Sequence, residues 1–152
     1  MNYLLDTCIL LVYLRRSNLS IQITKHFQPL ISPSIPIISV VSKAELKSIA
    51  IRNQWGKKRL DLLEEFLQQF LIADINIETI IQRYAEIDAY SQGRLSGRPL
   101  AVSARNMGKN DLWIAATASV LKAKLLTLDN DFDHLKNEFI DIEKIEYKYG
   151  VE

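Results

Sequence analysis

The sequence predicts an α/β fold in which a mainly parallel sheet is packed between helices. Short apolar segments of strand length alternate with longer segments whose apolar residues recur at helical spacing, which is typical of parallel sheets with helical crossovers. The chain has 152 residues, of which 48% are hydrophobic and 24% charged, and no internal repeat or linker divides it. A chain of this length buries roughly 70% of its unfolded surface. We therefore expect one domain over residues 1–152.

The first strand is expected over Asn2–Leu5, because this short apolar segment ends at Asp6, a residue type that caps helices. The segment Ser32–Pro36 contains two prolines and is expected to interrupt regular structure, since proline has no backbone N–H to donate to a ladder. The spacing of apolar residues predicts the other elements of the first half: a helix directly after Asp6, a helix over Leu19–Phe27, a strand restarting at Ile37, and two helices, expected to form a hairpin, over Ser39–Arg52 and Gly56–Phe70.

One long loop interrupts the second half of the chain. Residues Ser91–Lys109 contain three glycines, a proline and several basic side chains without an apolar period, so we expect a loop beside the functional face. The elements predicted around it are a strand over Leu71–Asp74, a helix capped by Asn76 and running toward Tyr90, a helix starting at Asn110 or Asp111, a strand over Lys124–Leu128, a short helix over Phe132–Lys136 and a strand over Phe139–Ile145.

Cysteine content and the N-terminal residues bear on the cellular location. The single cysteine, Cys8, excludes an internal disulfide framework and a cysteine-rich zinc cluster, which fits a reducing compartment. The N-terminal segment lacks the basic start and long apolar stretch of a signal peptide, and no apolar run reaches membrane-spanning length. We therefore expect a cytoplasmic protein with no membrane partner.

The basic residues are unevenly distributed although the formal net charge is only +1. One basic stretch runs from Lys43 to Arg59 with Glu45 as its only acid, and a second runs from Arg94 to Lys109 without any acid. Such stretches can hold a nucleic-acid backbone. The residues expected to contact RNA are Lys43, Arg94, Arg98, Arg105 and Lys109.

Four carboxylates are expected to meet at one edge of the sheet. Asp6 and Asp129 directly follow predicted strands, and the carboxyl ends of parallel strands are where such folds usually place their sites. Asp111 starts the helix that leads back into a strand, and Glu45 lies about one turn into the helix after the second strand, on its inward face. At about 4 Å and an effective dielectric near 20, each pair of carboxylates repels by on the order of 4 kcal/mol. A cation would remove this repulsion.

Oxygen ligands without a nearby histidine or cysteine select Mg²⁺ or Mn²⁺ over Zn²⁺. A water activated by such an ion could attack a phosphodiester bond. Taken singly, each acid also has an ordinary structural explanation, as a helix cap, a first-turn acid, a surface ion-pair partner or a turn residue. The joint pattern is what favours a metal site. Asp129 is favoured as the fourth acid because it lies closest to the strand end, with Asp131, expected to cap the short helix, as the alternative.

Four motifs in the same order resemble those of PIN-domain ribonucleases, specifically the VapC-like toxins of type II toxin–antitoxin systems. They are Leu5–Thr7 after the first strand, Ile38–Leu46, Asn110–Ala118 and Leu126–Phe132, and together they span most of the chain. The resemblance implies a three-layer α/β/α fold and an endoribonuclease activity dependent on Mg²⁺ or Mn²⁺. It also implies supporting polar roles for Thr7, Asn110 and Thr127, a small antitoxin as partner, and a homodimer.

Two other classes of function were weighed against the ribonuclease. A catalytically silent RNA-binding or regulatory module is disfavoured because all four acids are present. A phosphoacceptor signalling domain expects an acidic pair after the first strand, where this chain has Thr7 beside Asp6. The sequence leaves the target RNA open between transfer RNA and ribosomal RNA.

Overall fold

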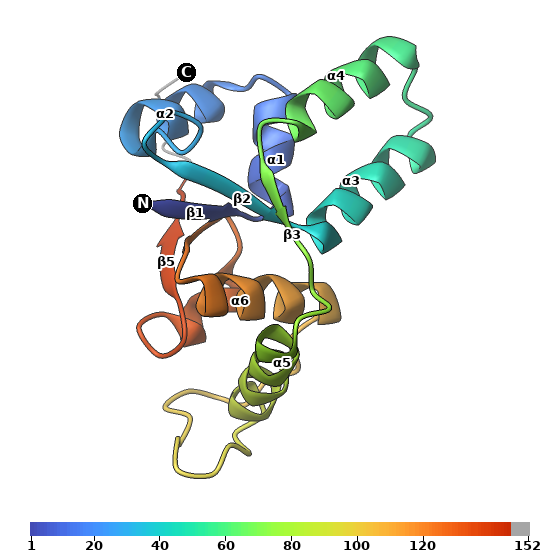
Figure 1. The fold of residues 1–152 in the computed structure, drawn as a ribbon. Coiled ribbons are helices and arrows are strands. Elements are labelled where there is room, and N and C mark those ends of the chain that lie inside the picture. Colours follow the sequence, from blue (N-terminus) through green and yellow to red (C-terminus); the bar gives the residue numbers. More distant parts are fainter. Residues whose placement is uncertain (147–152) are drawn as a thin grey trace.

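The computed structural model describes residues 1–146, and residues 147–152 of the predicted domain lie outside the described part. Its centre is a five-stranded sheet in the order β3-β2-β1-β4-β5, in which every neighbouring pair is parallel (Figure 1). The predicted α/β fold with a mainly parallel sheet is therefore confirmed. The strands are β1 (Asn2–Leu5), β2 (Ile35–Ser39), β3 (Leu71–Ala73), β4 (Lys124–Thr127) and β5 (Asp141–Lys144).

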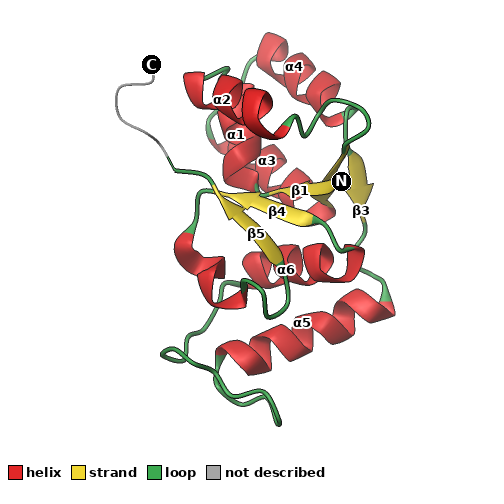
Figure 2. Ribbon diagram, turned by 90° about the vertical axis from the view of Figure 1, so that its left-hand side faces the viewer, coloured by secondary structure: helices red, strands yellow, loops and turns green. Residues whose placement is uncertain are grey.

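Helices cover both faces of the sheet, which makes a three-layer α/β/α arrangement (Figure 2). One face carries α1 (Thr7–Leu14), α2 (Asn18–Phe27), α3 (Val40–Arg52) and α4 (Lys57–Leu67), and α3 and α4 project together as a hairpin (Figure 1). The other face carries α5 (Glu78–Ser91), α6 (Lys109–Leu121) and the short 3₁₀ helix η1 (Asn130–Leu135). Within residues 1–146, no helix combines the length and apolar character needed to cross a membrane.

The central strand β1 shows why both faces must be covered. Successive residues of a strand point to opposite faces, so Leu4 joins the core beneath α5 and α6 while Leu5 joins the core beneath α1 to α4. Both leucines are completely buried. A near-continuous apolar strand is the pattern expected when a parallel sheet has helices on both sides.

Pro36 lies inside β2, so the expectation that this proline interrupts regular structure is wrong. The N–H of Ile35 donates to the carbonyl of Met1 on the β1 side, so the nitrogen of Pro36 faces the opposite side. On that side β3 begins pairing only at Ile37, opposite Leu71. The missing donor of Pro36 therefore costs no ladder hydrogen bond.

The N-terminal boundary of α5 also differs from expectation. Ile77, not Asn76, occupies the capping position, and the N–H of Asn76 instead donates to Asp74 Oδ1 at 3.0 Å in the preceding turn. The loop predicted between Ser91 and Lys109 is present, since α5 ends at Ser91 and α6 begins at Lys109. This loop brings α6, and with it Asp111, to the carboxyl edge of the sheet.

Candidate metal centre at the carboxyl edge of the sheet

Three aspartates converge where β4 ends and α6 begins. Oxygen atoms of Asp111, Asp129 and Asp131 all lie within 4.8 Å of one another. Asp111 sits in the first turn of α6, while Asp129 and Asp131 follow β4 at the start of η1. Two chain segments therefore present their carboxylates to one point.

Asp6 lies at the end of β1 and is only 5% exposed. The backbone N–H of Thr7 donates to its Oδ1 at 2.8 Å, and the hydroxyl of Thr127 donates to its Oδ2 at 2.7 Å. The thiol of Cys8 lies 3.3 Å from the same Oδ2. Burial raises the pKa of Asp6, these hydrogen bonds oppose the rise, and the charge of Glu45 adds to it. Asp6 is thus a buried carboxylate with a fixed orientation.

Glu45 approaches from α3 and is held by Thr7. The hydroxyl of Thr7 donates to Glu45 Oε1 at 2.8 Å and lies 3.0 Å from the hydroxyl of Ser42. Thr7 therefore links the Asp6 segment to the Glu45 helix. The inward orientation expected for Glu45 is the one observed, with the side chain half-buried.

The turn after β4 corrects one expectation about the acids. The helix cap of η1 is Asp129, whose Oδ1 accepts the N–H of Asp131 at 3.0 Å, so Asp131 is not the capping residue. Asp129 is positioned in turn by Thr127, whose hydroxyl oxygen accepts the Asp129 N–H at 3.0 Å. Asp131 is exposed, yet it lies in the same cluster as Asp129. Both acids can therefore reach an ion held by Asp111.

Electrostatic repulsion is concentrated at Asp111. Its pKa is raised from 3.8 to about 7, first by burial and then by the charges of Asp6, Asp129, Asp131 and Glu45. The charges of Asp6 and Glu45 thus act on Asp111 even though these two residues lie outside the tightest group of three. The assembled carboxylates favour a cation, as expected for acids held together in a poorly solvated site.

The donor set fits a hard divalent cation. The ligands available are carboxylate oxygens, which suit Mg²⁺ or Mn²⁺. The one sulfur nearby, Cys8 Sγ, is an unsuitable ligand because burial and the charge of Asp6 raise the pKa of the thiol to about 12. The thiol instead accepts the N–H of Leu128 at 3.4 Å, which joins the start of α1 to the end of β4.

A cavity with both polar and apolar walls opens at Glu45. It has a volume of about 430 Å³ and includes Glu45, Asn110 and Arg52 in its wall. Asn110 was expected as a supporting residue, whereas Arg52 was not singled out. Its position at the end of α3, about two turns from Glu45, could have suggested it, since residues spaced in this way share a helix face.

The basic residues expected to contact RNA divide into two groups. Arg98 is occupied: it forms an ion pair with Glu138 at 3.1 Å, donates to the Glu138 carbonyl at 2.7 Å and lies 4.0 Å from the ring centroid of Phe139. Its side chain fixes the long loop against the segment that precedes β5. Lys43, Arg94, Arg105 and Lys109 have no ion pair among those found within residues 1–146.

His134 lies in η1, directly after the acidic turn, and is buried, although the sequence favours a surface or capping role for it. Its Nε2 is 2.7 Å from the Ser91 hydroxyl, which itself donates to Met107 Sδ at 3.4 Å. The hydroxyl therefore accepts from His134, so Nε2 carries the proton, and no partner within the described residues reaches the buried Nδ1. Burial, and next the charge of Arg105, lower the pKa of His134 to about 4, against a smaller opposing effect of Asp133. A neutral histidine thus connects η1 to both ends of the long loop.

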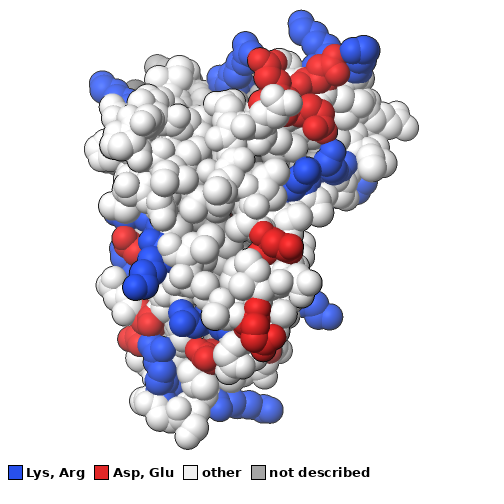
Figure 3. All heavy atoms as spheres, in the orientation of Figure 1, with Lys and Arg blue, Asp and Glu red and all other residues white. Residues whose placement is uncertain are grey.

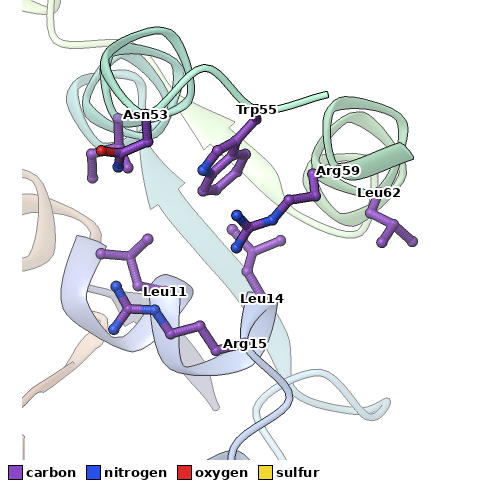
Figure 4. Close-up of a pocket in the computed structure, with 8 residues that line it drawn as sticks. Leu11, Leu14, Arg15, Asn53, Trp55, Arg59 and Leu62 are labelled. Atoms are coloured by element: carbon purple, nitrogen blue, oxygen red, sulfur yellow. The ribbon is translucent and has the colours of Figure 1, made fainter. Parts of the chain in front are cut away.

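A second cavity of about 260 Å³ lies between α1, α3 and α4 (Figure 4). Leu11, Leu14 and Leu62 give it apolar walls, and Arg59 lies over the ring of Trp55 with its guanidinium carbon 4.6 Å from the ring centroid. Arg15 lines the same cavity. Charged side chains in the space-filling view also gather at this α3–α4 end and at the α5 end, with a mostly uncharged surface between them (Figure 3).

The fold and the acidic edge define the class: a three-layer α/β/α protein with a candidate divalent-metal centre at the carboxyl ends of parallel strands. Residues 3–138 match the family model of the PIN domain. The chain belongs to the PIN domain family.

Several solved structures, some of them of toxin–antitoxin systems, contain chains with a similar fold. A chain of VapBC2 from Rickettsia felis bound to a promoter DNA fragment matches with a TM-score of 0.73 and 21% identity, covering 95% of this chain and 98% of that one. VapBC-1 from nontypeable Haemophilus influenzae matches with a TM-score of 0.70 and 22% identity over 95% and 98%. FitAcB from Neisseria gonorrhoeae matches with a TM-score of 0.67 and 20% identity over 93% and 96%. No curated protein matches the sequence.

Proposed function

We propose that this protein is a metal-dependent endoribonuclease, the toxin of a toxin–antitoxin pair, which uses Mg²⁺ or Mn²⁺ at the acidic edge. The observation that carries the proposal is the convergence of carboxylate oxygens of Asp111, Asp129 and Asp131 within 4.8 Å of one another. The charges of Asp6 and Glu45 add to the repulsion at Asp111. Membership of the PIN domain family and the likeness to chains of VapBC and FitAcB complexes support it.

Each part of the site has a distinct task under this proposal. Asp6, Asp111 and Asp129, with Glu45 and Asp131, would hold the ion, which supplies a nucleophilic water and stabilises charge on the phosphate. Thr7 and Thr127 keep Asp6 and Glu45 oriented through the hydrogen bonds described above. The basic side chains beside the acids would bind the RNA backbone.

The test is cleavage of total bacterial RNA by the purified protein, with or without a chelator. Asp111→Asn should reduce Mg²⁺-dependent cutting at least about 100-fold, because it removes a charge and a ligand from the cluster. Asp61→Asn is the matched control, since Asp61 lies on α4 and forms only an exposed ion pair with Lys57 at 2.6 Å. Cutting that survives the chelator, or persists in Asp111→Asn, contradicts the proposal. Binding without cutting would indicate the silent RNA-binding module instead.

A small antitoxin is the proposed protein partner. Similar chains occur in structures of VapBC toxin–antitoxin systems. The cavity between α1, α3 and α4 offers leucine side chains beside Arg15 and Arg59. That chemistry suits a partner segment with apolar and acidic residues. Leu14→Asp should weaken a co-purified complex, measured by titration calorimetry, whereas Leu60→Asp, at an exposed position on α4, should leave it unchanged.

A homodimer is also proposed. Exposed apolar side chains at the edge strand β3 and the start of α5 supply a surface for it: Leu71, Ile72, Ile77 and Ile81. Sedimentation velocity at micromolar concentration should give the mass of a dimer. A monomer at that concentration contradicts this part of the proposal.

A further inference from the structure

The long loop between α5 and α6 closes into a basic pocket that lies outside the acidic cluster. The pocket has a volume of about 270 Å³ and is lined by Gln92, Arg94, Ala104, Arg105 and Asn106. In Figure 1 the loop is the yellow segment that extends beyond α5. We call these five residues the loop pocket.

Backbone contacts at the base of the loop build the pocket. The N–H of Arg94 donates to the Ala89 carbonyl at 2.8 Å, and the N–H of Arg105 donates to the Ser91 carbonyl at 2.8 Å. Gly93 adopts a φ of +73°, and a Cβ placed on it would lie 3.9 Å from Ala104 Cβ. The outgoing and returning segments of the loop are therefore side by side, each contributing one arginine to the same pocket.

The two arginines of the loop pocket carry uncompensated charge. Among the ion pairs found within residues 1–146, none involves Arg94 or Arg105, in contrast to Arg98, which pairs with Glu138. Asp88 Oδ1 accepts a hydrogen bond from Gln92 Nε2 at 2.9 Å, and Asp133 is paired with Lys144 at 3.0 Å, so neither acid is in an ion pair with the two arginines. Two guanidinium groups that share a pocket repel each other, and one anion that accepts hydrogen bonds from both removes that repulsion.

The loop pocket lies close to the acidic cluster along the chain. A Cβ on Gly108 would lie 3.8 Å from Asp111 Oδ2, and Asn106 precedes Gly108 by two residues, a stretch of chain that spans at most about 7 Å. An extended ligand that reaches the aspartates can therefore continue into the pocket. A short stretch of single-stranded RNA has both the length and the regularly spaced anionic groups for this.

We propose that the loop pocket is a phosphate subsite that binds one backbone phosphodiester of the RNA, near but not at the bond that is cut. The inference rests on the proposed ribonuclease function. Arg94 and Arg105 would grip the phosphate oxygens, with the side-chain amides of Gln92 and Asn106 as further donors. The subsite would set the position of cutting relative to the strand without contacting the metal.

The test is a phosphate-neutralisation scan. The probe is a single-stranded RNA oligonucleotide that contains a site cut by the wild-type protein, prepared as a series with one uncharged methylphosphonate at each position. Binding is measured on Asp111→Asn protein, so that the RNA stays intact. Arg94→Gln/Arg105→Gln is compared with Lys25→Gln/Lys122→Gln, which removes the same charge from exposed positions on α2 and at the C-terminal end of α6.

With native loop arginines, one methylphosphonate position should lower affinity about 5- to 10-fold, and this position should lose its effect in the Arg94→Gln/Arg105→Gln protein. The slope of log affinity against log salt should fall by about 0.7, because one phosphate contact to a single strand is lost. The control should keep the sensitive position. If the wild-type protein cuts RNA but no position distinguishes the loop variant from the control, the subsite is disproved and the ribonuclease stands. If the wild-type protein does not cut RNA, the proposed function fails and the subsite with it.

Discussion

At the scale of single residues, one hydroxyl group connects two acids that come from opposite ends of the chain. Thr127 donates to Asp6 Oδ2 at 2.7 Å and accepts the N–H of Asp129 at 3.0 Å. Thr127 is completely buried, so neither contact has a water to replace it if the hydroxyl is lost. Side chains that orient ligands in this way are often worth 10- to 100-fold in metal affinity or activity.

Thr127→Val should therefore lower RNA cleavage about 10- to 100-fold and weaken Mg²⁺ binding, because the isosteric methyl group neither donates to Asp6 nor accepts from Asp129. Thr127→Ser keeps the hydroxyl and should restore most of the activity. Cleavage rates over a Mg²⁺ titration would show this. Activity that is kept in Thr127→Val and lost in Thr127→Ser would mean that packing of the methyl group, not the hydroxyl, matters at this position.

Asp111 should make the metal-free protein less stable at neutral and higher pH. Its pKa of about 7 lies above the value of 3.8 for a free aspartate, so the folded state binds more protons than the unfolded state between those pH values. Stability from this group is present at low pH and is lost as pH rises from about 4 through 7. In the presence of a chelator at pH 8, Asp111→Asn should stabilise the protein by about 1–2 kcal/mol, discounted for partial solvation. Chemical denaturation at pH 5 and pH 8 checks this, and a variant less stable at both pH values contradicts it.

His134 should have the opposite pH dependence. Its folded pKa of about 4 lies below the ordinary value of 6.5, so in this interval the unfolded state binds more protons. Stability should be lost as pH falls from 6.5 toward 4, by up to about 3 kcal/mol. Comparing wild type with His134→Gln isolates the effect, because glutamine keeps a donor for Ser91 and does not titrate. A stability difference that is constant over this interval would contradict the assignment.

At the scale of elements, α6 is packed on two sides, between the sheet and α5. Ala115, Ala116 and Ala118 are completely buried, and their small side chains allow this close approach. The same helix carries Asp111 in its first turn. Displacement of α6 would therefore move a carboxylate of the acidic cluster.

Ala115→Leu should destabilise the protein by about 1–3 kcal/mol, because a fully packed position has no room for the additional carbons. Ala85→Leu, at an exposed position on α5, is the control and should change stability by less than about 0.5 kcal/mol. Thermal unfolding of both variants measures the loss of stability, and Mg²⁺-dependent cleavage measures the effect of displacing Asp111. Wild-type stability in Ala115→Leu would show that α6 has more space than the burial indicates.

The elements were predictable to the extent that each has its own apolar period. The spacing of apolar residues predicts the buried strands and most helices. The absence of such a spacing predicts the loop between Ser91 and Lys109. The position of Pro36 within β2 was not predictable, because it depends on which side of the strand has a neighbour. The start of α5 differed by one residue because Asp74, not Asn76, provides the side-chain contact in that turn.

At the scale of the whole molecule, the sequence indicates which acids follow strands but not how close their carboxylates lie to one another. The order of the strands decides this, since β1 and β4 are neighbours at the centre of the sheet and their ends bring Asp6 and Asp129 together. The sequence also could not show that Arg98 is occupied by Glu138 while Arg94 and Arg105 share a pocket. Both facts depend on the path of the loop between α5 and α6, and this path cannot be predicted because the apolar residues of the loop have no regular spacing.

The pairing of β1 with β4 also determines when during synthesis the acidic edge can form. Asp6 leaves the ribosome 121 residues before Thr127, at which the strand that supports it from the other side ends. Domains generally fold as units during synthesis, so a nascent chain that lacks β4 has neither the Thr127 hydroxyl nor the acids at positions 129 and 131. Under the proposed function, the growing chain cannot cut the RNA around it until β4 and the turn after it have been made, and inhibition is needed only from that moment on.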